Sequence, residues 1–173
     1  MSRAQQICLV ALRTLIGWHF LYEGYVKLVA PSWGSDGVPV AAWSSSGYLR
    51  GATGPLAGAF HALASSPWIG TIDVVVAVTL AAVGLALMLG LLTQAACLGG
   101  ITMLALFYVS AIPISGLPEP RTEGAYLLVN KNLIELAALA VIFTFRTGRI
   151  AGLDRWFVDL RKRKTPGLKE AAV

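Results

Sequence analysis

Four apolar segments, each long enough to cross a lipid bilayer, constrain the fold of this chain more than any other feature. A spanning helix needs about 20 mostly apolar residues, because each residue of an α-helix advances about 1.5 Å. The segments cover residues 7–29, 69–92, 95–115 and 125–145. Of the 173 residues, 56% are hydrophobic and only 13% are charged. A soluble domain carries roughly a quarter charged residues. We therefore predict an all-α polytopic membrane protein, in which four transmembrane helices form an antiparallel bundle.

The same composition excludes several other classes of protein. An intrinsically disordered chain combines low hydrophobicity with high net charge, the opposite of what is found here. Two cysteines, Cys8 and Cys97, are too few for a disulfide framework or a zinc ribbon, and we expect both to be packing thiols. The first segment carries internal charges and no small-residue cleavage site, so we interpret it as a retained helix rather than a signal peptide.

The distribution of charge predicts the orientation in the membrane. Residues 1–145 contain as many basic as acidic side chains, so the whole net charge of +5 lies in residues 146–173. Lysine and arginine next to a span are retained on the cytoplasmic side, so we expect both termini there, in a bacterial inner membrane. The excess is a topology signal, and we predict no nucleic-acid partner. We divide the chain into a membrane domain, 1–148, and a basic cytoplasmic tail, 149–173.

The connections between the segments differ in length. Residues 93–94 are too few for anything but an antiparallel hairpin between the second and third segments. The long outer loop, 30–68, holds one short helical stretch, 55–64. It also contains four aromatic residues that we expect at the level of the lipid headgroups: Trp33, Trp43, Tyr48 and Trp68.

Residues 149–164 have the pattern of an amphipathic helix that lies at the membrane surface. Ile150, Leu153, Trp156, Phe157 and Leu160 share one face, and charges occupy the other. This helix anchors the tail to the bilayer or docks a protein partner, and we favour the anchor.

Small residues recur in the second and third segments. The spacing of Ala86 and Gly90 allows two helices to approach closely. This approach could serve packing inside the bundle or a homo-oligomer, and the sequence leaves both open.

Charged residues inside the spans indicate the functional site. A charge at the centre of a transmembrane helix costs about 2.5–3.5 kcal/mol, so such residues are functional candidates by default. His19, Glu23 and Lys27 follow one another at four-residue spacing and share a helix face, as do Lys131 and Glu135. The alternative is that these charges only pair with each other and fix the register of the helices.

We predict that the catalytic residues are His19, Glu23, Lys27, Lys131 and Glu135, gathered in the outer half of the membrane. The candidate substrate-binding residues are Trp18, Asp73, Tyr108, Asn130 and Asn132. Arg13 lies nearer the cytoplasm, where its side chain could reach the inner headgroups.

The chemistry open to this cluster is narrow. The sequence has no dinucleotide fingerprint, no P-loop and no zinc-protease motif, and its two histidines do not suit a haem in the bundle. We predict no intrinsic metal or haem. A buried set of histidine, glutamate and lysine suits a carbonyl-bearing, lipid-soluble molecule that exchanges protons, which a quinone is.

The ordered motifs of this chain resemble the DoxX/DoxD family. The resemblance covers roughly residues 8–145 and rests on Gly17–Leu28 (GWHFLYEGYVKL), Gly47-Tyr48-Leu49 with Gly54-Pro55, Gly84–Thr93 (GLALMLGLLT) and Asn130–Glu135 (NKNLIE). It implies a four-helix inner-membrane protein whose family activity is thiosulfate:quinone oxidoreduction, shared between two types of subunit. By resemblance the polar core would contain Glu23, Lys27, Asn130, Lys131, Asn132 and Glu135. A protein partner would supply the sulfur chemistry, because this chain shows no second, periplasmic domain.

Two other functions stay open. The chain could be a non-enzymatic accessory or scaffold subunit of a larger respiratory or redox complex, in which the tail and outer loop matter most. It could also be a small-solute transporter, although paired, broken helices are missing from the pattern.

Overall fold

The computed structural model describes residues 1–29, 43–53, 55–110 and 128–164, and these form helices and no β-strand. The all-α prediction is confirmed at this level. The elements are α1 (Arg3–Val29), α2 (Ser46–Arg50), α3 (Ala57–Ala64), α4 (Ile69–Leu89), α5 (Thr93–Ser110), α6 (Lys131–Thr144), a 3₁₀ turn η1 (Thr147–Arg149) and α7 (Leu153–Lys164).

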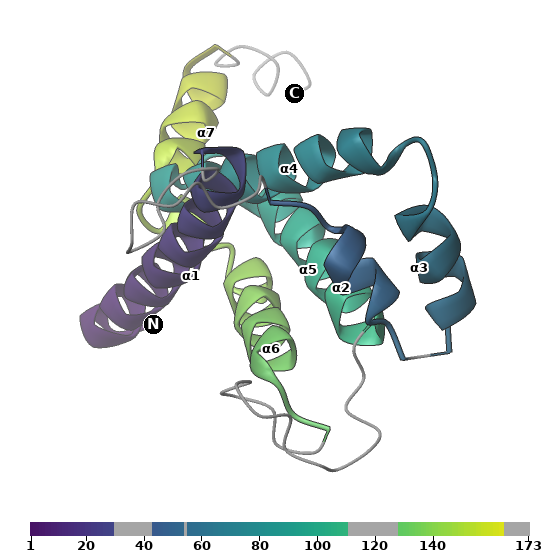
Figure 1. Cartoon of the computed structure of the whole chain (residues 1–173). Coiled ribbons are helices and arrows are strands. Elements are labelled where there is room, and N and C mark those ends of the chain that lie inside the picture. The colour runs from purple at the N-terminus through teal and green to yellow at the C-terminus, as the bar shows by residue number, and fades with distance from the viewer. Residues whose placement is uncertain (30–42, 54, 111–127, 165–173) are drawn as a thin grey trace, which may run out of the picture.

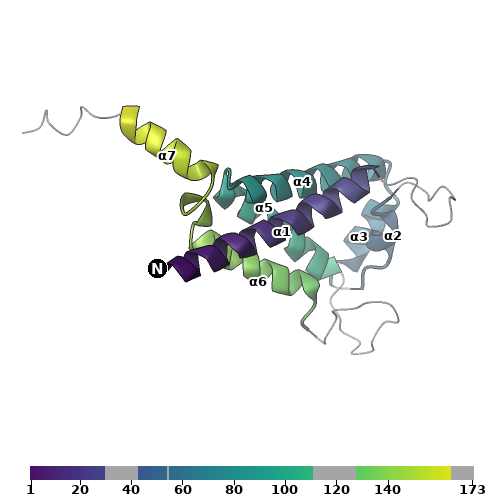
Figure 2. The same ribbon diagram turned by 90° about the vertical axis from the view of Figure 1, so that its left-hand side faces the viewer.

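The four long helices pack around a common core (Figure 1). α1 contacts α4 and α6, and α5 contacts the same two helices, so the packing order is α1, α4, α5, α6. Figure 2 shows that the N-terminus and α7 lie at one end of the bundle, with α2 and α3 at the other. The predicted hairpin between α4 and α5 is confirmed, with a turn over residues 90–92.

Apolar side chains from all four long helices fill the core. Its buried members are Phe20, Leu80, Val83, Leu87, Ala96, Cys97, Leu104, Leu139 and Ile142. The prediction of a packing thiol is confirmed for Cys97. It is wrong for Cys8, which is exposed on the outer side of α1.

Glycines bring α1 and α4 into backbone contact. A Cβ atom on Gly84 would overlap the backbone of Leu21, and one on Gly24 would overlap the backbone of Ala81. The close approach predicted from the small residues of the second segment therefore exists, and it lies at Gly84 rather than at the spacing of Ala86 and Gly90. Gly90 instead ends α4 in the left-handed conformation, with φ of 63°, which glycine adopts without steric cost.

Two of the four long helices, α4 and α5, are long and apolar enough to cross a membrane on their own. α6 begins at Lys131, six residues after the predicted start of the fourth segment, because Asn130 caps it and Leu128 and Val129 are not helical. Its 14 residues extend about 21 Å, less than the hydrocarbon core of a bilayer. Residues 111–115 and 125–127 of the predicted segments lie outside the described residues. That all four helices span the membrane stays a prediction.

The C-terminal segment is bound to the end of the bundle through polar contacts. Arg13, considered above as a headgroup contact, is only 3% exposed, and its Nη2 donates a hydrogen bond of 2.6 Å to the carbonyl oxygen of Ala151. The carboxylate of Asp154 accepts from the backbone N–H groups of Leu92 and Thr93, at 2.7 and 2.9 Å. These bonds cap the first turn of α5. The tail helix, predicted from residue 149, begins at Leu153, four residues later.

Candidate functional site

A cavity of about 430 Å³ lies among the four long helices, toward the end of the bundle that carries α2 and α3. Most of its wall is aliphatic or aromatic. This part of the wall contains Phe20, Trp43, Tyr48, Leu49, Phe60, Leu63, Ile72, Val76, Leu80, Met103, Leu104, Leu106 and Phe107. The rest of the wall is polar, and all of its charged side chains come from α1 and α6.

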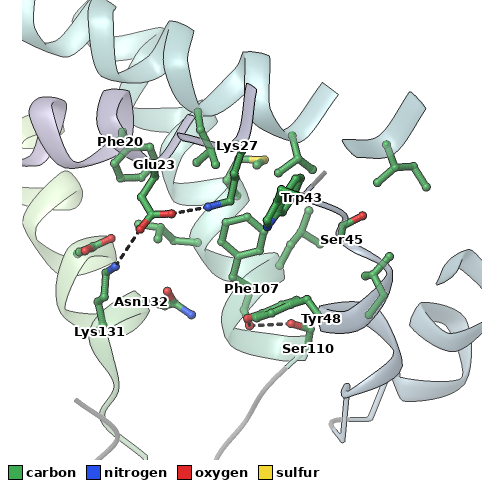
Figure 3. Close-up of a pocket in the computed structure, with 18 of the residues that line it drawn as sticks. Phe20, Glu23, Lys27, Trp43, Ser45, Tyr48, Phe107, Ser110, Lys131 and Asn132 are labelled. Carbon is green, nitrogen blue, oxygen red and sulfur yellow. Dashed lines mark hydrogen bonds and ion pairs between the residues drawn. The ribbon is translucent and has the colours of Figure 1, made fainter. Parts of the chain in front are cut away.

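Glu23 is the centre of the exposed part of this polar wall (Figure 3). One of its carboxylate oxygens accepts a hydrogen bond from Nζ of Lys27, one turn further along α1. The other oxygen lies 3.8 Å from Nζ of Lys131 on α6. A single carboxylate therefore connects two ammonium groups from two helices.

A second polar contact between α1 and α6 lies beside the first pair. Nε2 of His19 is 3.2 Å from Oε1 of Glu135, again between α1 and α6. The sequence predicted pairing along each helix, at four-residue spacing. In the structure this holds for Glu23 and Lys27, whereas Lys131 and Glu135 each pair with a residue of α1. With a neutral imidazole, the two lysines and two glutamates of this wall balance each other.

Aromatic residues in and just before α2 cover the cavity next to the charged wall. Nζ of Lys27 lies 5.2 Å from the centre of the Trp43 ring, within the range of a cation–π contact. Tyr48 packs edge-on against Phe107 of α5, and its hydroxyl donates a 3.0 Å hydrogen bond to the carbonyl oxygen of Phe107. The sequence predicted Trp43 and Tyr48 as headgroup anchors, whereas both line the cavity. No local sequence pattern predicts that these two rings line the cavity, because the contacts join segments far apart in the chain.

Asp73 lies outside the cavity and holds part of its cover in place. Its carboxylate accepts hydrogen bonds from the hydroxyl of Ser45 and from the N–H of Ser45, the latter at 2.7 Å. Ser45 lines the cavity and directly precedes α2. The charge that we assigned to substrate binding thus positions a neighbouring segment.

The remaining predicted substrate-binding residues divide between the cavity and the outside. Asn132 lines the cavity. Trp18 is 55% exposed on the outer side of α1. The hydroxyl of Tyr108 donates to the carbonyl oxygen of Leu128, at 2.9 Å, and Asn130 caps α6 by accepting from the N–H of Leu133, at 3.1 Å. All five predicted catalytic residues line the cavity, but only one of the five predicted binding residues does.

This arrangement suits one kind of ligand better than others. The apolar wall can hold an uncharged ring or chain, and the charged wall can donate hydrogen bonds from lysine or exchange a proton through histidine and glutamate. Among the described residues, no group of three or more histidine, cysteine, aspartate or glutamate side chains is arranged to hold a metal ion.

No protein-family model, no curated protein and no solved structure matches this chain.

Proposed function

We propose that this protein is a four-span subunit of a bacterial inner membrane that binds a quinone in its cavity and exchanges protons with it. The observation that carries the proposal is the charge-balanced cluster of His19, Glu23, Lys27, Lys131 and Glu135 on one wall of an otherwise apolar cavity of about 430 Å³. A neutral ring with polar oxygens complements both walls. A scaffold subunit requires no such cavity.

The outer surface of the bundle supports a membrane location. In the apolar stretches of α4 and α5, only 28% and 33% of the residues are buried inside the protein. Their outer faces expose large aliphatic side chains, among them Val74, Val75, Val78, Leu85, Leu89 and Leu98. Apolar patches of this extent mark a membrane or protein contact. Lipid can cover such side chains along the whole length of a helix.

The chemistry follows from what quinone reduction consumes. Conversion of a quinone to a quinol takes up two electrons and two protons, one proton at each carbonyl oxygen. Lys131 can donate a hydrogen bond to one carbonyl oxygen, which stabilises the negative charge that develops there. The paired His19 and Glu135 can pass a proton to the ligand and recover one from the outer face. The electrons would come from a partner subunit, and from thiosulfate in the reaction implied by the family resemblance.

Titration of the purified full-length protein with a short-chain quinone tests the proposal. Trp43 lines the cavity, so a bound quinone should quench its fluorescence, and the Trp43→Phe variant should lose that part of the quenching. We expect Glu23→Gln and Lys131→Met each to raise the Kd roughly tenfold, which corresponds to about 1.4 kcal/mol.

Thr102→Val is a matched control, since Thr102 is exposed on α5 and its hydroxyl bonds only to the carbonyl oxygen of Leu98 within its own helix. Saturable quenching with an unchanged Kd in both cluster variants, or no saturable quenching at all, would contradict the proposal.

A further inference from the structure

A second cavity, of about 540 Å³, lies at the other end of the bundle, where the C-terminal segment meets the turn between α4 and α5. It is a groove bounded by that turn, by η1 and by the start of α7. Its lining contains Leu91, Leu92, Thr93, Gln94, Ala95, Arg146, Gly148, Arg149, Asp154 and Phe157. None of these residues takes part in the candidate site described above.

The polar part of the groove carries positive charge without a matching anion. Arg146 and Arg149 are both exposed, and no residue of the described ranges forms an ion pair with either guanidinium. Asp154 is the one acidic side chain in the lining, and both of its oxygens accept backbone N–H groups of the turn. The groove therefore keeps a net positive charge. Its two guanidinium groups can each donate a pair of hydrogen bonds, which suits a phosphate.

The other part of the groove is apolar and continues onto α7. Leu91, Leu92 and Phe157 line it, and Leu92 is exposed. Trp156 lies beside Phe157, with 5.4 Å between the ring centres, and both rings are exposed. A free inorganic anion would leave these side chains without a partner. A ligand with an anionic head and an apolar chain would use both parts of the groove.

The location of the groove agrees with such a ligand. α4 ends and α5 begins at this turn, so the groove lies at headgroup depth if these helices cross the membrane, as we propose above. The whole net charge of +5 falls in residues 146–173, the part of the sequence that begins at this groove. Clusters of basic residues next to a span attract anionic lipids.

We propose that this groove binds an anionic phospholipid, with the phosphate between Arg146 and Arg149 and an acyl chain along Leu91, Leu92 and Phe157. The site goes beyond the quinone cavity and shares with it only the premise that α4 and α5 lie in a membrane.

The test is native mass spectrometry of the full-length protein in detergent, titrated with phosphatidylglycerol or phosphatidylcholine. We expect a preference for phosphatidylglycerol. The Arg146→Gln/Arg149→Gln variant should weaken its binding by roughly fivefold for each arginine removed and leave phosphatidylcholine binding unchanged. Arg50→Gln is the matched control, because Arg50 is an exposed arginine at the opposite end of the bundle.

Equal binding of the two lipids, or wild-type affinity in the double variant, would overturn the proposal. Displacement of phosphatidylglycerol by millimolar inorganic phosphate would also overturn it, in favour of a simple anion site. A quinone titration of the same double variant separates the two proposals, since its cavity is intact and its quinone Kd should be that of the wild type. An unchanged thermal midpoint verifies that the variant is folded.

Discussion

Glu23 shows how single residues make charge tolerable beside an apolar cavity in this protein. Its carboxylate accepts from Lys27 and faces Lys131, while His19 and Glu135 form a second pair beside it. An isolated charge would cost several kcal/mol in hydrocarbon, whereas paired charges at the edge of a cavity keep both partners and partial access to water. These pairs also need α1 and α6 to lie close together.

The glycines of α1 and α4 are equally specific, and Gly84 gives a test. We expect Gly84→Ala to destabilise the protein by about 1–3 kcal/mol, since the added methyl group would overlap the backbone of Leu21 and force the helices apart. A lowered thermal midpoint in detergent would record this. Gly70→Ala is the control on the same helix, because a Cβ atom there meets nothing within 4 Å. Equal effects of the two substitutions would argue against the observed α1–α4 contact.

At the scale of an element, the residue at which α6 begins decides which of its side chains reach α1. Asn130 has an extended backbone and caps the helix, so that Lys131 stands in the first turn, within reach of Glu23. Glu135, one turn later, reaches His19. The position of this helix start therefore decides which residues of α6 face the cavity.

Replacement of the cap tests this role. Asn130→Ala should lower the free energy of unfolding by about 1 kcal/mol, since the N–H of Leu133 loses its side-chain acceptor and keeps only the carbonyl oxygen of residue 130. Quinone binding should weaken with it, because fraying of the first turn frees Lys131. Asn130→Asp keeps an acceptor at the same position and should preserve both stability and binding. If Asn130→Ala behaves like Asn130→Asp in both measurements, the cap does not position Lys131.

On the scale of the whole molecule, the two ends of the bundle perform different tasks. One end holds the cavity under the segment around α2, which Asp73 and Tyr48 secure to α4 and α5. The other end holds the C-terminal segment through Arg13 and Asp154. Each end thus joins parts of the chain that are remote in sequence.

Asp154 tests the junction at the second end. Asp154→Ala should cost about 1–3 kcal/mol, because two backbone N–H groups lose a charged acceptor. Trypsin should then cleave faster after Arg149 and Arg155, as α7 loses its side-chain bonds to the turn and keeps only the backbone bond from residue 154 to Gly90. Asp159→Ala is the control, since Asp159 is an exposed aspartate on the same helix. Identical cleavage rates for the two variants would show that Asp154 does not hold α7.

Helical spacing alone does not predict which polar residues line the cavity. His19, Glu23 and Lys27 were found because residues four apart share a helix face, and this holds in any straight helix. Asp73, Asn130 and Tyr108 are polar residues of the same kind, yet each bonds to backbone or to a neighbouring serine instead of facing the cavity. Spacing along one helix does not specify which neighbour lies opposite.

Interactions between neighbouring residues determine much of the secondary structure of this protein. Runs of apolar residues with few charges predict helices, a short polar break predicts a hairpin, and four-residue spacing predicts the charged face of α1, because each depends on neighbours within a few turns. Packing between distant segments decides three further features. They are the polar contacts between α1 and α6, the cover formed by Trp43 and Tyr48, and the burial of Arg13 next to Ala151. That packing follows from the combined fit of all helices, above all the glycine contact of α1 with α4, and no single segment of the chain encodes it.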